Sequence, residues 1–319
     1  MNAIRLGPGA EFDLIRSLLI RYGAAAAGVG DDAAVVHVPA GEMLLASTDV
    51  AVEDVHFRAT WMSADAIGYR ATMAALSDLA AMAATPRGIL VALTLPRRWR
   101  DSATAIADGI ARAARETDAP IVGGDVSGGE ALSIAVTVLG STARPLTRSG
   151  AHPGDAIWVT GRFGGPALAL DALAGGRRPA PADAARFTAP VARLREGMWL
   201  AAHGARAGVD VSDGLAADLG HLAAASGVRV MLDLDLVPTV DGATPEVAAA
   251  SGEEYELAVA GPADLDAGAF AREFGIPLTR VGTVDAVAIA GASGAGADVR
   301  AIRRGVAVPL PPGFDHLSS

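Results

Sequence analysis

The sequence predicts two domains of mixed α/β structure, and three observations support this expectation. The chain has 319 residues, about twice the length of an ordinary domain. Strand-like and helical patterns alternate along it, as they do in α/β and α+β proteins. A hydrophobic content of 51% against 19% charged residues suffices for a sizeable core. We place the boundary between residues 143 and 144, where the stretch Ser141–Asp155 is rich in glycine, proline and basic residues.

The pattern of the first domain begins with a helix. Apolar residues at helical spacing predict this helix over Glu11–Tyr22, and Gly23 suits its end. The elements expected after it are strands at Ala33–Val38 and Met43–Thr48, a helix from Ser63 to about Ala84 ended by Pro86, a strand over Gly88–Leu95, a helix from Asp101 or Ser102 to about Thr117, and strands at Ile121–Val122 and Leu132–Leu139 around a glycine-rich turn.

The second domain repeats this mixture of elements. The expected strands are Ala156–Thr160, Val209–Val211, Val228–Leu232, Tyr255–Ala260 and Leu278–Val284. The expected helices are Gly164–Ala174, Val191–Ala205, Leu215–Ser226 and Ala267–Phe274. Two segments are too rich in glycine, proline or arginine for regular structure, so we expect an exposed loop at Gly175–Ala185 and a flexible loop or hairpin at Gly291–Gly296.

Missing residue types exclude several kinds of chemistry. The sequence holds no cysteine and no lysine. Disulfides, thiolate nucleophiles and zinc–thiolate sites are therefore excluded, and so are a Walker lysine and a Schiff-base lysine. A net charge of −10 argues against a nucleic-acid partner and against electrostatic docking to anionic lipid.

No segment has the pattern of a membrane span or a secretory signal. The apolar run Ala64–Ala84 is interrupted by Asp65, Arg70 and Asp78, so it falls short of a continuous span. The N-terminus lacks a basic start followed by an apolar block. We therefore expect a cytoplasmic protein with no membrane partner.

Aspartates in small or apolar surroundings are the most informative feature. An acid in such surroundings is costly unless an arginine, a helix N-terminus or a metal ion neutralises it. Few arginines lie nearby in the sequence, so the pattern favours metal, although each aspartate taken singly is more often a cap or turn residue. The strings are Gly30-Asp31-Asp32, Ser47-Thr48-Asp49, Ser77-Asp78, Gly123-Gly124-Asp125 and Asp210-Val211-Ser212-Asp213-Gly214.

The donor atoms of these strings indicate a hard cation. Carboxylate and hydroxyl oxygens suit Mg²⁺ rather than zinc, and Mg²⁺ commonly completes its shell with water and phosphate. Gly123-Gly124 and Gly128-Gly129 allow the backbone to come close to a ligand. His56 is either structural or a polar contact to a substrate. Arg148 suits a phosphate group, and the alternative is a surface arginine in a linker.

The ordered set of strings resembles the thiamine-monophosphate kinase family, whose superfamily includes aminoimidazole ribonucleotide synthetase and selenophosphate synthetase. Further matching strings are Val55-His56-Phe57, Leu76–Met82, Arg148-Ser149-Gly150-Ala151 and Gly252–Leu257. The resemblance implies an α/β (α+β) two-domain PurM-like fold, with an N-terminal sheet that pairs across a homodimer and a C-terminal α/β sandwich domain. It implies that residues 1–143 bind metal and nucleotide and that residues 144–319 complete the ATP and substrate site.

The same resemblance implies transfer of the γ-phosphoryl group of ATP to thiamine monophosphate, without a general base. It implies Mg²⁺ ions at Asp32, Ser47, Thr48, Asp49, Asp78, Asp125, Asp210 and Asp213. It implies ATP contacts at Gly124, Asp125, Arg148 and Ser212, and thiamine monophosphate contacts at His56, Glu253 and Phe314.

The chain departs from the family pattern at several positions. Ala83 stands where the family usually has Gly, and Glu254 where it usually has Asp. Val126–Gly129 lacks the usual Thr and Arg. Three other interpretations stay open: another ATP-dependent synthetase of the superfamily, a non-catalytic nucleotide- or divalent-ion-binding regulator, and an acidic α/β protein whose aspartates only cap helices.

Overall fold

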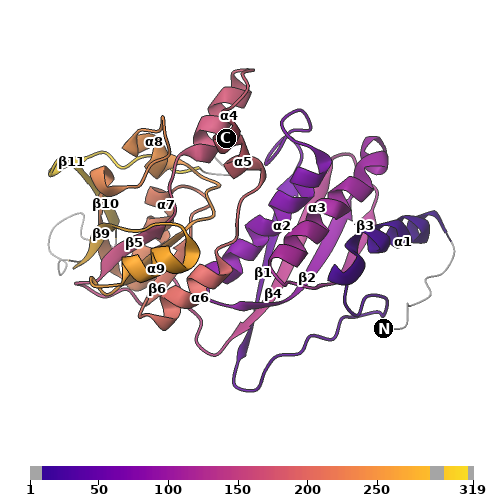
Figure 1. Ribbon diagram of the computed structural model, residues 1–319, viewed down its shortest axis with the longest axis horizontal. Coiled ribbons are helices and arrows are strands. Elements are labelled where there is room, and N and C mark those ends of the chain that lie inside the picture. The colour runs from indigo at the N-terminus through magenta and orange to yellow at the C-terminus, as the bar shows by residue number, and fades with distance from the viewer. Residues whose placement is uncertain (1–8, 288–297, 315–319) are drawn as a thin grey trace. The chain divides into compact units, whose positions relative to one another are not determined.

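A computed structural model of the chain describes residues 9–287 and 298–314 (Figure 1). The chain divides into two compact units. The first comprises Met1–Leu79 and Ala84–Arg144, and the second comprises Ala80–Ala83 and Pro145–Ser319. Each unit has its own sheet. No described helix combines the length and hydropathy of a membrane span.

The first unit is built on a four-stranded sheet with the strand order β1-β4-β2-β3. The strands are β1 (Met43–Val52), β2 (Thr85–Thr94), β3 (Ile121–Ser127) and β4 (Ser133–Thr142). β4 pairs antiparallel with both β1 and β2, whereas β2 and β3 are parallel. β1 and β3 therefore form opposite edges of this sheet.

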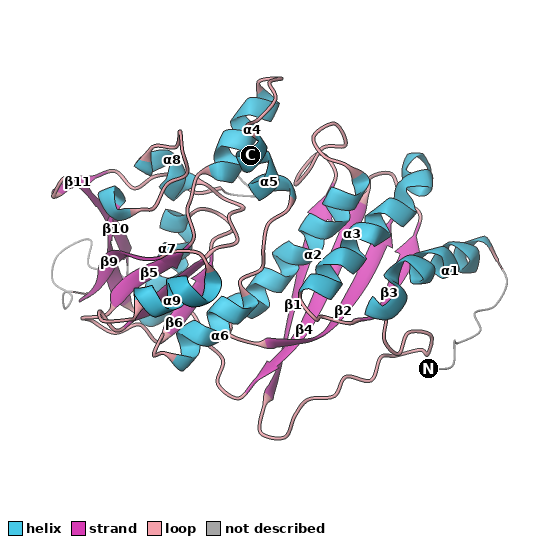
Figure 2. Cartoon of the chain, viewed as in Figure 1, coloured by secondary structure: helices cyan, strands magenta, loops and turns pink. Residues whose placement is uncertain are grey.

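One face of this sheet is covered by the helices α2 (Ala64–Ala81) and α3 (Ala103–Glu116), which lie across it in Figure 2. Ile134, Val136 and Val138 alternate along β4 and are fully buried, as a period-two strand with one covered face requires. α1 (Ala10–Tyr22) packs beside α3 and β3.

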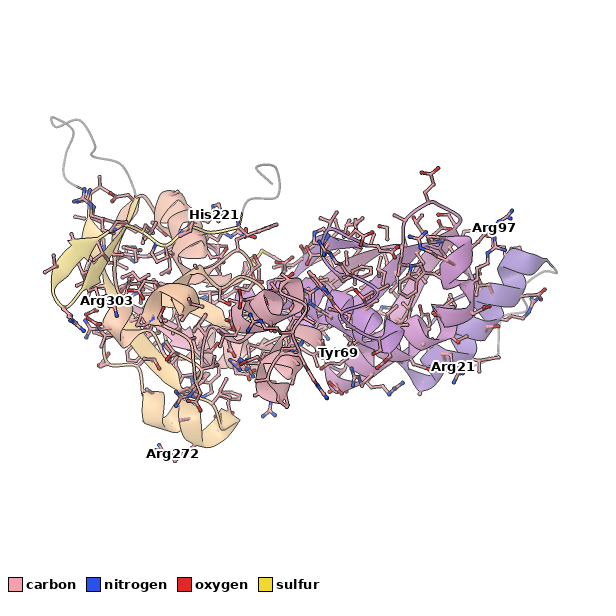
Figure 3. All side chains as sticks on the ribbon, turned by 90° about the horizontal axis from the view of Figure 1, so that it is seen from above. Arg21, Tyr69, Arg97, His221, Arg272 and Arg303 are labelled. Carbon is pink, nitrogen blue, oxygen red and sulfur yellow. The ribbon has the colours of Figure 1, made fainter. Side chains whose placement is uncertain are left out.

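Two glycines allow α2 and α3 to approach closely. A Cβ atom at Gly109 would lie 1.9 Å from the carbonyl oxygen of Asp65, and one at Gly68 would lie 2.2 Å from that of Ile106. Tyr69 joins the same helices, because its hydroxyl donates to Glu116 at 2.7 Å (Figure 3). The backbones of α2 and α3 are thus in contact with each other, and the helix pair packs on the sheet.

The second unit has a seven-stranded mixed sheet with the order β11-β10-β7-β9-β5-β8-β6. Its strands are β5 (Ala156–Thr160), β6 (Ala207–Asp210), β7 (Val228–Asp233), β8 (Leu257–Gly261), β9 (Leu278–Ala286), β10 (Asp298–Arg303) and β11 (Val306–Val308). Its helices are α4 (Gly165–Ala174), α5 (Pro181–Thr188), α6 (Leu194–Ala202), α7 (Leu215–Ser226), α8 (Pro245–Ala250) and α9 (Ala267–Phe274).

The second sheet is covered on both faces along β5, β8 and the edge strand β6. Every residue of these strands is buried, which explains why β5 and β8 are continuous apolar runs rather than alternating ones. α7 packs against the sheet through Leu219 and Leu222, which join Val230 and Val281 in one core. The loop that leads from β6 into α7 is therefore anchored at both ends.

Most of the expected elements are confirmed, and the mixed α/β architecture is as the sequence predicts. β5, α7 and α9 have the expected bounds. The strand expected at Ala33–Val38 is wrong, because this exposed segment pairs with no neighbouring strand among the described residues, and an isolated strand is not stable. The loop expected over Gly175–Ala185 is wrong in its second half, where Pro181 opens α5.

Two turn assignments are also wrong. α2 ends before Pro86, at Ala81, and Ala83 follows with a φ of 54°, a left-handed conformation in which glycine is favoured. Pro86 itself lies in β2. The pair Gly123-Gly124 lies inside β3 rather than in a turn. The sequence patterns missed α8, β10 and β11, and the loop expected at Gly291–Gly296 lies outside the described residues.

The helix contact at Gly109 yields a stability prediction. We expect Gly109→Ala to lower the free energy of unfolding by about 2 kcal/mol or more, because the new methyl group overlaps a backbone carbonyl. Gly220→Ala in α7 is the control, since no atom lies within 4 Å of its Cβ position. That variant should gain about 0.5–1 kcal/mol from helix propensity. Urea unfolding of both variants measures this, and equal shifts would contradict the close packing.

Candidate functional site

Three of the residues expected to bind metal meet on the helix-covered face of the first sheet. Ser47 and Asp49 lie two positions apart on β1, so their side chains point to the same face. α2 carries Asp78 against that face, and the Ser47 hydroxyl donates a hydrogen bond to Asp78 Oδ2. The packing of one helix on one edge strand thus gathers two carboxylates and a hydroxyl.

The electrostatics of this group favour a cation. Burial and, to a smaller extent, the negative charge of Asp78 raise the pKa of the Asp49 carboxyl to about 6. Neither carboxylate has an arginine or histidine partner within residues 9–287 and 298–314. All the donor atoms are oxygen, which Mg²⁺ prefers. The residues present therefore fit a hard divalent cation, which would replace the missing positive charge.

The other expected ligands of the first unit lie apart from this group. The Thr48 side chain points to the opposite face of the sheet, where its hydroxyl lies 2.9 Å from that of Thr137. Asp125 is on β3, and two strands separate it from β1, which corresponds to about 14 Å. Asp32 is exposed in the segment that follows α1. One ion cannot join Asp49, Asp125 and Asp32, so these positions would need several ions or a ligand of some length.

His56 lies in the turn after β1. Its Nδ1 accepts a hydrogen bond from the Val52 N–H at 3.1 Å, and its carbonyl accepts one from Arg70 at 3.3 Å. The buried side chain of Phe57 anchors the same turn. Because Nδ1 is an acceptor, the neutral ring carries its proton on Nε2. The turn therefore sets both the orientation and the tautomer of this histidine.

In the second unit, five of the expected residues converge at the loop between β6 and α7. Asp210 ends β6, and Ser212 and Asp213 follow in the loop. The N–H of Glu253 donates to the Ser212 carbonyl at 2.7 Å, and the N–H of Phe314 donates to the Asp213 carbonyl at 2.9 Å. Segments far apart in the sequence are thus hydrogen-bonded to one short loop.

Arg148, also in the second unit, borders a different part of that sheet. Its neighbour Thr147 forms a parallel bridge with Ala207 at the start of β6. The Arg148 carbonyl accepts a hydrogen bond from the Ser226 hydroxyl at 2.8 Å. Its exposed side chain forms no ion pair within the described part of the chain. The guanidinium group is thus available to an anionic ligand.

Asp218 holds the β6–α7 loop in place and was missed in the sequence analysis. Its Oδ2 accepts hydrogen bonds from three consecutive backbone N–H groups, at 3.0 Å from Ser212, 3.1 Å from Asp213 and 3.2 Å from Gly214. Burial raises its pKa to about 7. Carboxyl oxygens of Asp213 and Asp218 also lie within 4.8 Å of a ring nitrogen of the exposed His221 (Figure 3). The sequence did contain a signal for Asp218, since it is an acid in the first turn of the predicted helix that follows the Asp-Val-Ser-Asp string.

Buried glutamates support the loop that carries Glu253. Glu256 forms a bidentate ion pair with Arg193, with N–O distances of 2.6 and 2.9 Å. It also accepts a hydrogen bond from the Thr160 hydroxyl at 2.7 Å. Glu254 accepts a hydrogen bond from the backbone N–H of Gly164, directly before α4. Glu253 itself has a φ of 58°, an uncommon backbone conformation for a residue with a side chain. These contacts hold Glu253 against Ser212.

Comparisons with known proteins agree with this architecture. Residues 30–142 match the N-terminal domain, and residues 152–293 the C-terminal domain, of the AIR synthase related proteins. The chain is therefore a two-domain protein of the PurM-like class. Within that class it belongs to the thiamine-monophosphate kinase family. The thiamine-monophosphate kinase of Rhodopirellula baltica is 36% identical over 281 residues, which cover 81% of this chain and 83% of that protein.

Solved structures support the same assignment. The thiamine-monophosphate kinase from Stenotrophomonas maltophilia K279a has a TM-score of 0.79 and 34% identity, and the match covers 94% of this chain and 98% of the other. AaThiL complexed with AMPPCP and TMP has a TM-score of 0.74 and 29% identity, and the match covers 99% and 100% of the two chains. The fold expected from the sequence is confirmed, whereas the pairing of the N-terminal sheet across a dimer stays a prediction.

The contacts of Asp218 yield a prediction about local dynamics. We expect Asp218→Asn to accelerate amide hydrogen exchange at Ser212, Asp213 and Gly214, because a neutral oxygen accepts their hydrogen bonds more weakly. Ala225→Ser, at an exposed position near the other end of the same helix, is the control and should leave these rates unchanged. Hydrogen exchange measured by NMR or mass spectrometry tests this. Unchanged exchange in Asp218→Asn would contradict the proposed support.

Glu254 yields a prediction about stability and pH. Burial raises its pKa to about 8 from the ordinary value of 4.5. Between these two pH values the folded protein binds more protons than the unfolded chain, so its free energy of unfolding falls as the pH rises. Glu254→Gln cannot ionise and should remove this decline, which is on the order of 2–4 kcal/mol. Urea unfolding at pH 5, 7 and 9 measures the difference, and parallel profiles for both proteins would refute it.

Proposed function

We propose that this protein is an ATP-dependent kinase of thiamine monophosphate. It would transfer the γ-phosphoryl group of ATP to thiamine monophosphate and form thiamine diphosphate and ADP, the last step of thiamine diphosphate biosynthesis. The relatives of this name match most of the chain. The structural observation that supports the proposal is the group of Ser47, Asp49 and Asp78, whose acids have no basic partner within the described residues.

The proposed chemistry brings two polyanions together. Like unit charges 4 Å apart repel by about 4 kcal/mol at an effective dielectric constant of 20. Mg²⁺ held by the chain would supply positive charge that offsets the negative charge of the phosphate oxygens. Asp49, Asp78 and Ser47 supply its oxygen ligands in the first unit, and Asp210 and Asp213 offer further carboxylates in the second. Asp32, Thr48 and Asp125 remain proposed ligands at separate positions.

We assign the remaining residues of the proposed site to the two substrates. ATP would contact Gly124, Asp125, Arg148 and Ser212, and the planar guanidinium of Arg148 can hold a phosphate group with two hydrogen bonds. Thiamine monophosphate would contact His56, Glu253 and Phe314. The hydrogen bonds that tie Glu253 to Ser212 and Phe314 to Asp213 support this assignment in the second unit.

Direct transfer needs no general base. The second pKa of a phosphate monoester is about 6, so the attacking oxygen of thiamine monophosphate is already largely ionised near neutral pH. The chain's contribution is to position this oxygen in line with the γ-phosphorus and to hold the charges that surround it. This mechanism forms no aspartyl-phosphate intermediate, and radiolabel from ATP that stayed on the protein would refute it.

We further propose a homodimer that works in the cytoplasm, where ATP is available. β1 is an edge strand, and Leu44 and Val50 on it are 53% and 47% exposed. They share a sheet face with Ala46, and that face carries none of the helices of the first unit. An apolar, unpaired edge of this kind favours association with another strand. Light scattering after gel filtration tests this, because a monomer at micromolar concentration would refute it.

An acceptor screen tests the proposed function. We expect rapid ADP release in the presence of Mg²⁺ and thiamine monophosphate, with thiamine diphosphate formed in equal amount. Thiamine without a phosphate group and other phosphate monoesters should give little turnover. ADP release that is independent of the acceptor would indicate another reaction, and binding of ATP without turnover would indicate a regulator.

The metal assignment predicts the effect of two variants. We expect Asp49→Asn and Asp78→Asn each to lower kcat at least a hundredfold, or to raise the Mg²⁺ requirement steeply, because each removes a charged ligand. Asp264→Asn, at an exposed position of the second unit between β8 and α9, is the control and should behave like the wild type. Mg²⁺ titrations of the coupled assay measure this. Near-normal rates at low Mg²⁺ in either active-site variant would overturn the assignment.

A further inference from the structure

The carboxylate of Glu53 joins three segments at one end of the first sheet. Glu53 directly follows β1, and only 8% of it is exposed. Its carboxylate accepts hydrogen bonds from Arg98 at 2.5 Å, from the Trp99 ring N–H at 3.1 Å and from the Leu132 backbone N–H at 3.2 Å. The end of β1, the short helix η2 (Arg97–Ser102) and the start of β4 are thus tied to one buried acid.

These hydrogen bonds keep Glu53 ionised despite its burial. Burial by itself would raise the pKa of the Glu53 carboxyl, but the three donors lower it, and the pKa lies below its ordinary value. Hydrogen bonds to an ionised acceptor are about twice as strong as those between neutral groups. Arg98 also donates to the Glu130 carbonyl at 2.8 Å, which extends the network to the loop between β3 and β4. The residue that ends β1 is therefore firmly held by its neighbours.

The turn that begins at Glu53 carries His56 and is strained. Asp54 has a φ of 65°, a left-handed conformation that is uncommon for a residue with a side chain. Its N–H donates to the Phe57 carbonyl at 2.7 Å. The His56 N–H donates to the Val52 carbonyl at 2.9 Å. A backbone conformation of this kind persists only where its surroundings hold it.

We propose that Glu53 is a positioning residue that fixes the His56 ring for contact with thiamine monophosphate. Glu53 and Phe57, the first and last residues of the turn, form a bridge with each other. The Glu53 network holds one end of the turn, and the burial of Phe57 holds the other. His56 lies between them, and its Nδ1 accepts the Val52 N–H.

The benefit of this arrangement is a histidine ring that is oriented before the substrate binds. In the neutral ring the proton lies on Nε2, because Nδ1 is already an acceptor. A group whose orientation and tautomer are set in advance loses less conformational freedom on binding. This inference rests on the proposed function, because His56 takes its role from the proposed thiamine monophosphate site.

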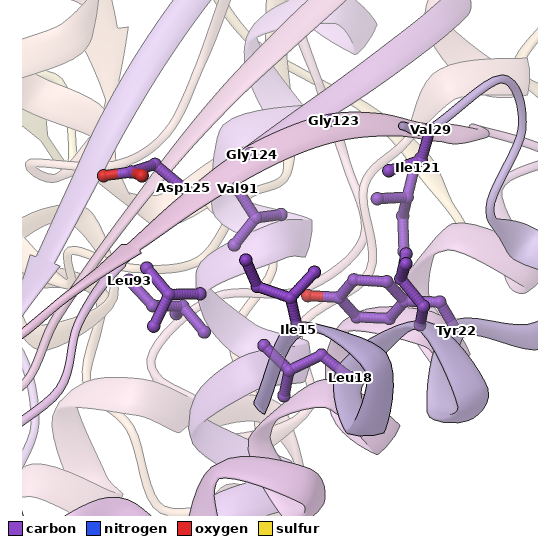
Figure 4. Close-up of a pocket in the computed structure, with 12 residues that line it drawn as sticks. Ile15, Leu18, Tyr22, Val29, Val91, Leu93, Ile121, Gly123, Gly124 and Asp125 are labelled. Atoms are coloured by element: carbon purple, nitrogen blue, oxygen red, sulfur yellow. The ribbon is translucent and has the colours of Figure 1, made fainter. Parts of the chain in front are cut away.

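The proposed ATP contacts of the same unit lie away from this turn. Figure 4 shows Gly124 and Asp125 on β3, and both residues are paired with residues of β2. β3 and β1, whose end carries Glu53, form opposite edges of the sheet. Loss of the Glu53 network should therefore affect thiamine monophosphate and leave ATP unchanged.

A double-mutant cycle tests this role. Glu53→Gln removes the charge and one acceptor oxygen. It should raise the KM for thiamine monophosphate about three- to tenfold, the value of one neutral hydrogen bond, while kcat and the KM for ATP stay within twofold of the wild type. In a His56→Ala background the same substitution should raise this KM no further, because Glu53 acts through His56. Additive effects of the two substitutions, or an unchanged KM in Glu53→Gln, would overturn the proposal.

Glu42→Gln is the matched control. Glu42 lies directly before β1, at the other end of the sheet, and accepts hydrogen bonds from Arg87 at 3.1 Å and from the Ser141 hydroxyl. Its substitution breaks a comparable link and should lower the melting temperature, while the KM for thiamine monophosphate stays within twofold. Equal rises of this KM in both variants would show a loss of stability rather than of positioning, and would overturn the proposal. Arg98→Gln, at a side chain that is 56% exposed, weakens the same network and provides the test if Glu53→Gln does not fold.

NMR of the histidine ring nitrogens separates this inference from the proposed function. Near pH 8 an ordinary histidine is neutral, so wild-type His56 should have its proton on Nε2, whereas Glu53→Gln should show a mixture of the two tautomers. The His56→Ala spectrum identifies the signals. Identical His56 signals in the wild type and Glu53→Gln would overturn the proposal. A wild-type protein that showed the expected difference but formed no thiamine diphosphate would contradict the proposed function and still support the effect of Glu53 on His56.

Discussion

The structure depends on two neighbouring carboxylates that receive no positive charge from the part of the chain that the structure describes. Asp49 and Asp78 come from different elements, and burial together with their mutual repulsion raises the pKa of Asp49. Folding would not bring such groups together for stability alone, because burial beside a like charge disfavours the ionised form of Asp49. A ligand with positive charge relieves this cost. The packing of α2 on β1 keeps the two carboxylates together.

Three other buried acids are neutralised by basic or polar side chains of the chain itself. Glu256 has Arg193 and Thr160, Asp155 has Arg206, and Glu53 has Arg98 and Trp99. These pairs are structural, since both charges are satisfied within the protein. Asp218 represents a third kind of buried acid, because one of its carboxyl oxygens accepts hydrogen bonds from three backbone N–H groups. The contrast separates acids that support the site from acids that are free to bind.

Much of the candidate site could be recognised from local strings of aspartate with serine or glycine. Only Asp210–Gly214 joins the end of a strand to the start of a helix, whereas the strings at Asp49, Asp78 and Asp125 lie inside their elements. β5 was predictable as a short continuous apolar run, and α7 and α9 were predictable from their helical apolar spacing and from the glycine or acidic residues at their ends. Ala33–Val38 has the same alternation and no strand, because a strand also needs a neighbour. The pattern could not reveal α5 inside a proline-rich stretch, nor the left-handed conformation of Ala83.

The sequence by itself determined the chemistry that is available to this protein. Without cysteine and lysine, and with repeated aspartates beside serine and glycine, the chain could offer mainly oxygen ligands, together with arginine and six histidines. The tertiary structure decided which of these groups act together. Ser47 and Asp49 share a face because strands alternate, Thr48 is turned away for the same reason, and Asp125 is placed on the far edge by strand order. Strand order and helix packing join distant segments, and no local pattern carries that information.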